Sequence, residues 1–292
     1  MKQLSPHTRA VALVLLAFFA YNVADAFLNK VVDLYHFGSV GFYPLISYLI
    51  LFLLFSKKLG GLGHITKTTK LKLHIARGIL GAIGFIGFIF AITYISLAET
   101  YTLVLTSPFW VALISIVLFK HKIGVHRWIA MVGGFIGVLI VLQPGSNTIH
   151  ISALGAIACA ISAASIMLIV KKIGAEEPMV NHIFFPVAII TIVMALINTL
   201  WKGWEPIALE DFIFFGLSGA IFLIADLLFS KGFSEEADTD FLAPLHYSQI
   251  IWGALIGYFF FNEMPEKWTF IGASIIIVSG VYLIHREAKQ KK

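Results

Sequence analysis

Two segments of this chain are nearly identical, and they lie almost half a chain length apart. Residues 110–114 read Trp-Val-Ala-Leu-Ile and residues 252–256 read Trp-Gly-Ala-Leu-Ile, an offset of 142 in a chain of 292 residues. The same offset places residues 42–44 (Phe-Tyr-Pro) over residues 184–186 (Phe-Phe-Pro). One register kept over so much of the chain indicates an internal duplication, which constrains the architecture before any single residue is interpreted.

The composition is that of a membrane protein, because 59% of residues are apolar and only 13% are charged. A helix needs roughly 17–21 apolar residues to cross a hydrocarbon core of about 30 Å. The chain is therefore predicted to be an all-α membrane protein with ten transmembrane helices. The expected spans lie at about 11–28, 39–55, 78–98, 101–119, 126–142, 152–170, 180–200, 212–230, 241–261 and 268–284.

The basic residues predict the orientation of these spans. With both termini in the cytoplasm, 18 of the 21 Lys and Arg residues, Arg77 among them, fall in inner segments, and only Lys30, Lys202 and Lys267 fall outside. Inner loops that face anionic lipid explain the net charge of +5 without any nucleic-acid partner. The single cysteine, Cys159, excludes a disulfide within the chain.

Five spans per repeat is an odd number, so the second copy must enter the membrane from the opposite side. We therefore expect two inverted five-helix repeats at 10–144 and 152–285, with short cytoplasmic tails at 1–9 and 286–292. Such pairs are typical of transporters, whose substrate site lies near the midplane between the repeats. A duplication that survives with no moving parts is the alternative.

Glycines and prolines inside the spans predict close packing and bends. Gly78, Gly81, Gly84 and Gly87 recur every third residue, and Gly133 with Gly137 forms a second pair of small residues. Pro44, Pro108 and Pro186 lie within apolar runs, where proline bends a helix.

Two carboxylates lie inside the spans, where an ionisable group costs about 2.5–3.5 kcal/mol and indicates a functional site by default. Asp25 is near the outer end of the first span and Asp226 is in the inner half of the eighth, roughly 15 Å apart at 1.5 Å per residue. Each is a candidate proton acceptor or partner of a cationic ligand group. The alternative is a structural residue that reaches the interface or pairs with lysine. His246 is a third candidate for proton coupling.

The two copies differ most where the second is longer, between Asp240 and Ile251. That stretch makes the ninth span more polar than the fourth, as expected where a specific ligand is bound. The aromatic pair Trp110 and Trp252 falls near the midplane, where it either lines a cavity or packs between helices. We expect the substrate cavity to be lined by Trp110, Trp252, Gln249, Tyr247 and Asn22.

The spans contain no Gly-x-Ser-x-Gly elbow, His-Glu-x-x-His pair or spaced Cys and His ligands. We therefore expect no enzymatic activity, no metal and no cofactor. A receptor or a non-transporting membrane scaffold is the alternative class.

The run from His246 to Tyr258, followed by Phe261-Asn262-Glu263 and by Gly272 and Gly280, resembles the second EamA repeat of the drug/metabolite transporter superfamily. The first copy, with Arg127-Trp128 and the stretch 137–144, resembles the matching repeat. The resemblance implies ten helices, cytoplasmic termini and a central cavity. It also implies substrates such as S-adenosylmethionine, riboflavin, opine-type metallophores or amino acids.

We therefore expect a secondary transporter in the cytoplasmic membrane that moves a small polar metabolite by alternating access. Its partners would be that metabolite and membrane lipid, and the protein would be a monomer or homodimer. The prediction for the site is that Trp252→Ala and Gln249→Ala abolish transport in folded protein.

Overall fold

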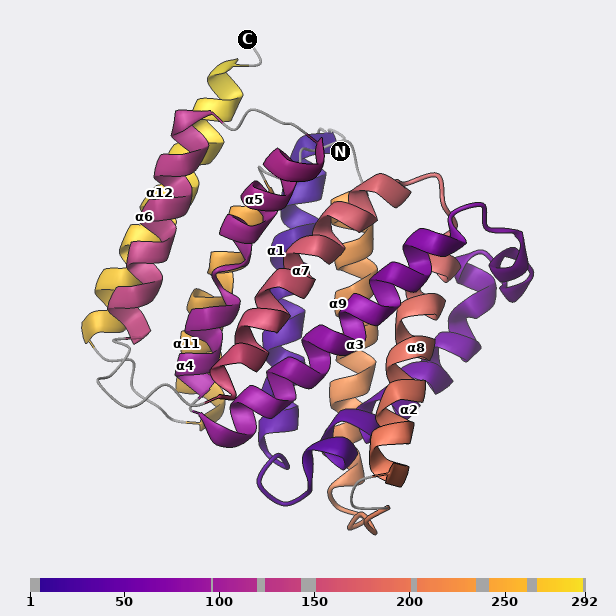
Figure 1. Cartoon of the computed structure of the whole chain (residues 1–292). Coiled ribbons are helices and arrows are strands. Elements are labelled where there is room, and N and C mark those ends of the chain that lie inside the picture. Colours follow the sequence, from indigo (N-terminus) through magenta and orange to yellow (C-terminus); the bar gives the residue numbers. More distant parts are fainter. Residues whose placement is uncertain are drawn as a thin grey trace.

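The computed structural model describes residues 6–95, 97–119, 124–142, 151–200, 204–234, 242–261 and 267–290, and within these residues the chain is helical with no β-strand (Figure 1). The first copy contains α1 (Pro6–Asn29), α2 (Phe37–Phe55), η1 (Ser56–Leu59), η2 (Leu62–Lys67), α3 (Leu71–Tyr94), α4 (Leu97–Val104), α5 (Ser107–Phe119) and α6 (Val125–Leu142). The second copy contains α7 (Ala153–Ile173), α8 (Met179–Leu200), α9 (Phe212–Ser234), η3 (Ala243–Tyr247), α11 (Ser248–Phe261) and α12 (Lys267–Gln290). The expected boundary between the repeats, residues 145–151, lies outside the described residues except for Ile151.

Each expected apolar run is helical over most of the part that the structure describes, since a backbone in lipid must satisfy its own hydrogen bonds. Among the described residues, α1, α2 with η1, α3, α7, α8 and α9 are long and apolar enough to cross a membrane, and shorter apolar helices lie at Ser107–Val117, Trp128–Ile140 and Phe270–Ser279. Large apolar side chains cover the outside of these helices; Leu54 and Val117 are both 72% exposed. Such a surface suits lipid and not water.

The fourth and ninth spans are irregular, which the length of their apolar runs did not predict. The fourth is divided at Leu105 and Thr106 into α4 and α5. Pro108, in the first turn of α5, has no N–H to donate to the carbonyl of Val104, so the helical hydrogen-bond pattern is interrupted at this point. In the ninth span the 3-10 helix η3, with Pro244 in its first turn, precedes α11. The two irregular points meet, because Ser107 Oγ hydrogen-bonds His246 Nδ1.

The two copies interlock, and their contacts correspond in pairs. Helix α1 packs against α9, and α7, which occupies the same place in the second copy, packs against α3. In the same way α2 packs against α9 and α8 packs against α3, while α6 packs against α12 (Figure 1). The first three helices of one copy therefore bury their apolar faces mainly against helices of the other copy.

The expected glycines lie at close contacts between these helices. A Cβ on Gly87 would come within 2.4 Å of the Gly155 carbonyl oxygen, where α3 crosses α7. A Cβ on Gly137 would come within 2.7 Å of the Gly272 carbonyl oxygen, where α6 crosses α12. The packing role predicted for the glycines is confirmed at these positions.

Candidate functional site

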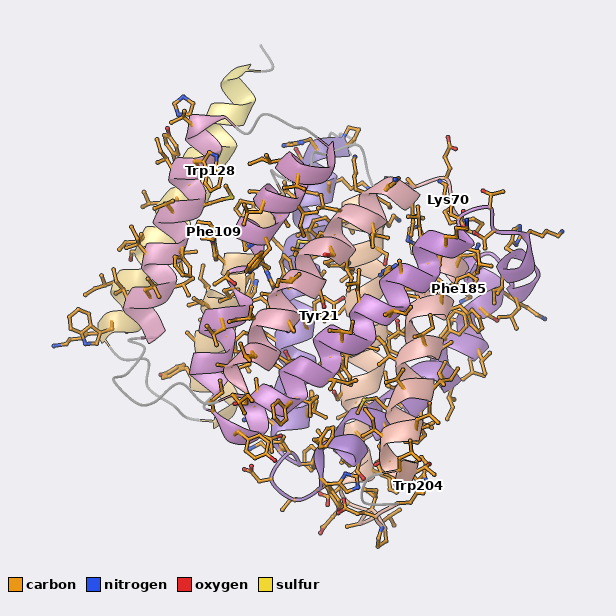
Figure 2. All side chains as sticks on the ribbon, viewed as in Figure 1. Tyr21, Lys70, Phe109, Trp128, Phe185 and Trp204 are labelled. Carbon is orange, nitrogen blue, oxygen red and sulfur yellow. The ribbon has the colours of Figure 1, made fainter. Side chains whose placement is uncertain are left out.

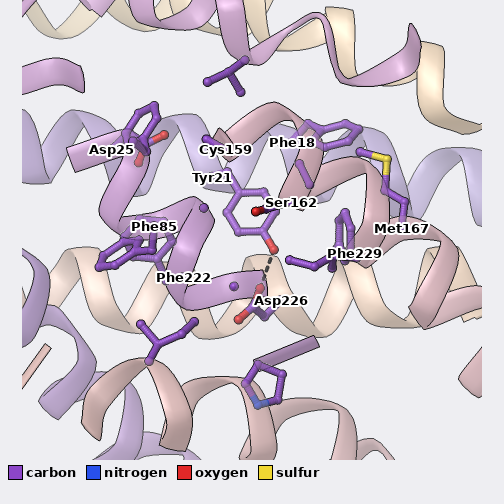
Figure 3. Close-up of a pocket in the computed structure, with 18 of the residues that line it drawn as sticks. Phe18, Tyr21, Asp25, Phe85, Cys159, Ser162, Met167, Phe222, Asp226 and Phe229 are labelled. Atoms are coloured by element: carbon purple, nitrogen blue, oxygen red, sulfur yellow. Dashed lines mark hydrogen bonds between the residues drawn. The ribbon is translucent and has the colours of Figure 1, made fainter. Parts of the chain in front are cut away.

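A cavity of about 270 Å³ lies at the centre of the described helices (Figure 3). Its size is close to the lower end of the roughly 300–1,000 Å³ typical of small-ligand pockets. Side chains from α1, α2, α3 and α4 of the first copy and from α7, α8, α9, η3 and α11 of the second copy line it. Most of the wall is apolar and aromatic, with a few polar groups, as in sites that bind a small organic molecule.

Asp226 on α9 lines the cavity and accepts two hydrogen bonds from tyrosine side chains. The Tyr48 hydroxyl donates a hydrogen bond of 2.6 Å to Asp226 Oδ2, and the Tyr21 hydroxyl donates to Asp226 Oδ1 (Figure 3). Both tyrosines come from the first copy, on α2 and α1, and Tyr21 lies near the middle of the molecule (Figure 2). Asp226 therefore ties the two copies together at the cavity.

Arg77 also lines the cavity, although the charge pattern predicts it in an inner loop. That prediction is wrong, because α3 begins at Leu71 and Arg77 is part of this helix. The Arg77 side chain is buried, with 3% of its surface exposed. Its Nη1 donates to the His182 carbonyl oxygen at 2.8 Å, and its Nη2 donates to Ser230 Oγ at 3.0 Å. Ser230 lies one turn after Asp226 on α9, so the guanidinium and the carboxylate face the same region.

Asp25 on α1 occupies a different part of the wall (Figure 3). The Tyr101 hydroxyl of α4 donates a hydrogen bond of 2.7 Å to Asp25 Oδ2. The structure thus gives the two carboxylates separate tyrosine partners in one cavity.

Two further expected residues, Gln249 and His246, line the cavity. Gln249 lies in the first turn of α11, and its Oε1 accepts a hydrogen bond of 3.3 Å from Asn22 Nδ2. Asn22 also donates to the Phe18 carbonyl oxygen at 2.9 Å, which fixes its amide. The His246 ring stacks on the Phe18 ring with 4.7 Å between centroids.

The described lining does not include four of the expected residues, namely Asn22, Tyr247, Trp110 and Trp252. Tyr247 is buried and donates to the Met131 carbonyl oxygen at 3.2 Å. Trp110 Nε1 donates to Thr106 Oγ1 at 3.2 Å, and the Trp252 ring meets the edge of Phe19 with 5.2 Å between centroids. Both tryptophans pack against the apolar cluster that contains three lining residues, Phe18, Met167 and Phe229.

The residues that sequence reasoning missed are Tyr21, Tyr48, Tyr101 and Arg77. Each tyrosine lies in an apolar run and bonds to a carboxylate far away in the sequence, so only the folded packing identifies it. For Arg77 a signal existed: it directly precedes the apolar run that was expected to start at residue 78. No group of three or more His, Cys, Asp or Glu side chains in the described part of the chain is placed to hold a metal.

Polar networks join the copies at both ends of the bundle, away from the cavity. At one end Glu177, between α7 and α8, accepts hydrogen bonds from Thr68 Oγ1 and Asn181 Nδ2, both at 2.6 Å, and lies 3.2 Å from His74 Nε2. Burial raises the pKa of Glu177, but the hydrogen bonds of Thr68, Asn181 and His74 outweigh burial and leave that pKa below its usual value.

At the other end the segment between α1 and α2 is tied to the segment before α9. The Tyr35 hydroxyl donates to Asp211 Oδ2 at 2.6 Å, and the His36 N–H donates to Glu205 Oε2 at 3.1 Å. The hydrogen bond to the Asp211 carboxylate raises the pKa of Tyr35. Figure 2 shows Lys70 and Phe185 near the Glu177 end and Trp204 near the opposite end.

The sequence pattern of the EamA-like transporter family matches residues 8–143 and, again, residues 150–286. The chain belongs to the EamA-like transporter family. This confirms the resemblance to the drug/metabolite transporters, and with the apolar helices it establishes a multi-pass membrane protein that contains two repeats.

Several relatives are named as transporters. An S-adenosylmethionine uptake transporter of Rickettsia prowazekii (strain Madrid E) is 30% identical over 76% of this chain and 75% of its own. A riboflavin transporter of Vibrio cholerae is 25% identical over 80% of this chain and 78% of its own, and a pseudopaline exporter of Pseudomonas aeruginosa is 24% identical over 94% and 95%. A protein solved by crystallography shares the fold, with a TM-score of 0.75 at 15% identity over 97% of this chain and 98% of that chain.

Proposed function

We propose that this EamA protein is a secondary transporter that moves a small polar organic metabolite across the cytoplasmic membrane by alternating access. The observation that carries the proposal is the central cavity, because helices of both copies enclose it. A site at the interface of two repeats can be exposed to either side when the helices around it shift. The two irregular spans meet beside it at Ser107 and His246, and broken helices in matching positions are typical of transporter substrate sites.

The proposal includes ten transmembrane helices in two inverted repeats at 10–144 and 152–285, with the tails 1–9 and 286–292 in the cytoplasm. The paired packing supports inversion, since exchanging the copies converts the α1–α9 contact into the α7–α3 contact. The polar networks at the two ends of the bundle correspond in the same way. Residues 30–36, between α1 and α2, contact the segment before α9. Residues 174–178, between α7 and α8, contact the segment before α3 and α3 itself. The Lys and Arg asymmetry independently supports a cytoplasmic position for both termini.

We assign direct substrate contact to Gln249 and His246. The other expected residues lie behind the cavity wall, and we assign them a supporting role. Asn22 orients Gln249, and Tyr247 fixes η3 to α6 through Met131. The pair Trp110 and Trp252 supports the apolar wall from outside. We assign proton coupling to Asp226, because its carboxylate lines the cavity and joins α9 to α1 and α2 through two tyrosine hydroxyls.

The relatives transport S-adenosylmethionine, riboflavin and pseudopaline according to their names. These compounds combine polar groups with a substantial carbon skeleton, which suits a wall that is mostly apolar with a few polar side chains. We therefore propose an amino-acid-derived or cofactor-like metabolite as the substrate.

Thermal unfolding of the detergent-purified protein with S-adenosylmethionine, riboflavin and single amino acids tests the proposal, because a ligand of the native state raises the melting temperature by mass action. The compound that raises it is then tested for transport in proteoliposomes, with empty liposomes as the control. We expect one chemical class to bind and to cross the bilayer. Binding without transport would favour a receptor, and neither binding nor transport would favour a membrane scaffold.

A further inference from the structure

The two carboxylates of the cavity differ in how their charge is balanced. Asp226 accepts two tyrosine hydrogen bonds and shares its region with the guanidinium of Arg77, which is anchored to Ser230 one turn away on the same helix. Two hydroxyl donors and a nearby cation are enough to hold a buried carboxylate without a ligand.

Asp25 has much less support. Within the described residues, its polar contact is a single hydrogen bond from the neutral Tyr101 hydroxyl to Oδ2, and no Lys, Arg or His there forms an ion pair with it. Because a carboxylate inside hydrocarbon is costly without a counter-charge, this position lacks a cation.

The wall around Asp25 is suited to an organic cation. The Tyr101 ring meets the Phe88 ring edge to face with 5.8 Å between centroids, and both rings line the cavity. Phe85, one turn before Phe88 on α3, also lines the cavity. Aromatic faces attract a cation through their quadrupole. Their apolar surfaces also pack against the carbon substituents of a sulfonium or alkylammonium group.

We propose that Asp25, with the rings of Tyr101, Phe88 and Phe85, forms a subsite for a positively charged group of the transported molecule. The substrate is then an organic cation or a zwitterion whose cationic centre lies at Asp25. This inference rests on the proposed transport function and assigns its substrate class. The ligand supplies the positive charge that balances the Asp25 carboxylate. Binding therefore depends on the charge of the ligand as well as on its shape.

Pairs of compounds that differ in one charge test the inference directly. S-adenosylmethionine is compared with S-adenosylhomocysteine, which has a neutral thioether in place of the sulfonium and keeps the other charges. Choline is compared with its uncharged carbon isostere, 3,3-dimethylbutan-1-ol. Thermal shifts of the full-length detergent-purified protein give the affinities. We expect at least one cation to stabilise the protein and the partner that lacks this charge to bind at least about tenfold more weakly, the factor that corresponds to the loss of a desolvated cation–π attraction.

The variant Asp25→Asn should weaken binding of that cation by a similar factor, whereas Asp33→Asn, the same change at an exposed position on the loop after α1, should not. If Asp25→Asn does not fold, the comparison of charged and neutral partners on the unaltered protein decides. Equal binding of the partners, unchanged binding in folded Asp25→Asn, or binding of riboflavin with no binding of either cation would each overturn the inference while the transport function stands. Binding of no compound, together with no transport, would remove the proposed function itself.

Discussion

A carboxylate inside the membrane must obtain its hydrogen-bond donors from the protein, and at the residue scale this requirement organises the cavity. Asp25 and Asp226 could be predicted from the sequence because a charge in an apolar run is conspicuous. Gln249 and His246 could be predicted because the second copy is longer and more polar there. Their partners could not: Tyr21 and Tyr48 lie 205 and 178 positions from Asp226, and a contact at that separation depends on how the helices pack.

For Asp226, we predict that Asp226→Asn removes the dependence of transport on a pH gradient while exchange of substrate continues. An amide keeps the shape of the side chain and accepts one of the two tyrosine bonds, but it cannot take up a proton. Uptake into proteoliposomes with and without an imposed pH gradient measures the effect, with Asp33→Asn as the control. Gradient dependence that survives in Asp226→Asn would exclude this residue as the coupling acid.

For Gln249, we predict that Gln249→Ala lowers transport at least about tenfold with little change in melting temperature. The change removes a polar group from the cavity wall and leaves Asn22 still bonded to the Phe18 carbonyl oxygen, so the local helix is retained. Asn29→Ala, an exposed amide at the end of α1, is the matched control.

Trp252, behind the cavity wall, gives a second comparison. Trp252→Phe keeps the packing against Phe19 and should retain most transport activity.

At the element scale, the helices are held by close backbone contacts, and the glycines that permit them could be predicted as packing residues. Their partners could not be predicted, because the spacing in one helix does not say which other helix it meets. The breaks in the fourth and ninth spans show a similar limit. Pro108 and Pro244 indicate a disturbance, but the bond between Ser107 and His246 that joins the two breaks depends on the assembled bundle.

The contact between α9 and α2 gives a prediction with a control on the same helix. A Cβ on Gly219 would lie 1.9 Å from the Pro44 carbonyl oxygen, whereas a Cβ on Gly216, one turn earlier, would meet nothing within 4 Å. Gly219→Ala should therefore lower the melting temperature clearly by separating α9 from α2. Gly216→Ala should leave it unchanged or raise it, since alanine in a helix is favoured by about 0.5–1 kcal/mol over glycine. Similar melting temperatures for the two variants would refute this contact.

The Glu177 network gives a pH-dependent prediction. Because the folded-state pKa of Glu177 is below the usual 4.5, its charged form stabilises the fold above about that pH, and the contribution disappears as the pH falls through the folded-state pKa. Glu177→Gln should therefore have a lower melting temperature than the wild type at neutral pH. The difference should shrink as the pH falls below 4.5, which a pH series of unfolding curves would show. A difference that is constant with pH would assign another role to Glu177.

At the scale of the whole molecule, the duplication, the apolar runs and the family resemblance were all accessible in the sequence, and the family is confirmed. What the sequence did not disclose is that each copy packs mainly against the other and not against itself. Networks at both ends of α2 and α8 then hold parts of the two copies together, through Glu177 at one end and Asp211 at the other. The alternating access that we propose would therefore require one of these networks to open while the other stays closed.

The central claim is that the substrate passes through the cavity between the copies, and obstruction of that cavity tests it most directly. Counterflow of the transported compound in proteoliposomes would be compared for the wild type, Ala163→Phe and Leu154→Phe. Both substitutions lie on α7, but Ala163 lines the cavity and Leu154 is 62% exposed on the outside. The account predicts that Ala163→Phe abolishes counterflow in folded protein and that Leu154→Phe retains it. Wild-type counterflow in folded Ala163→Phe would contradict the account, because the substrate would then take another route.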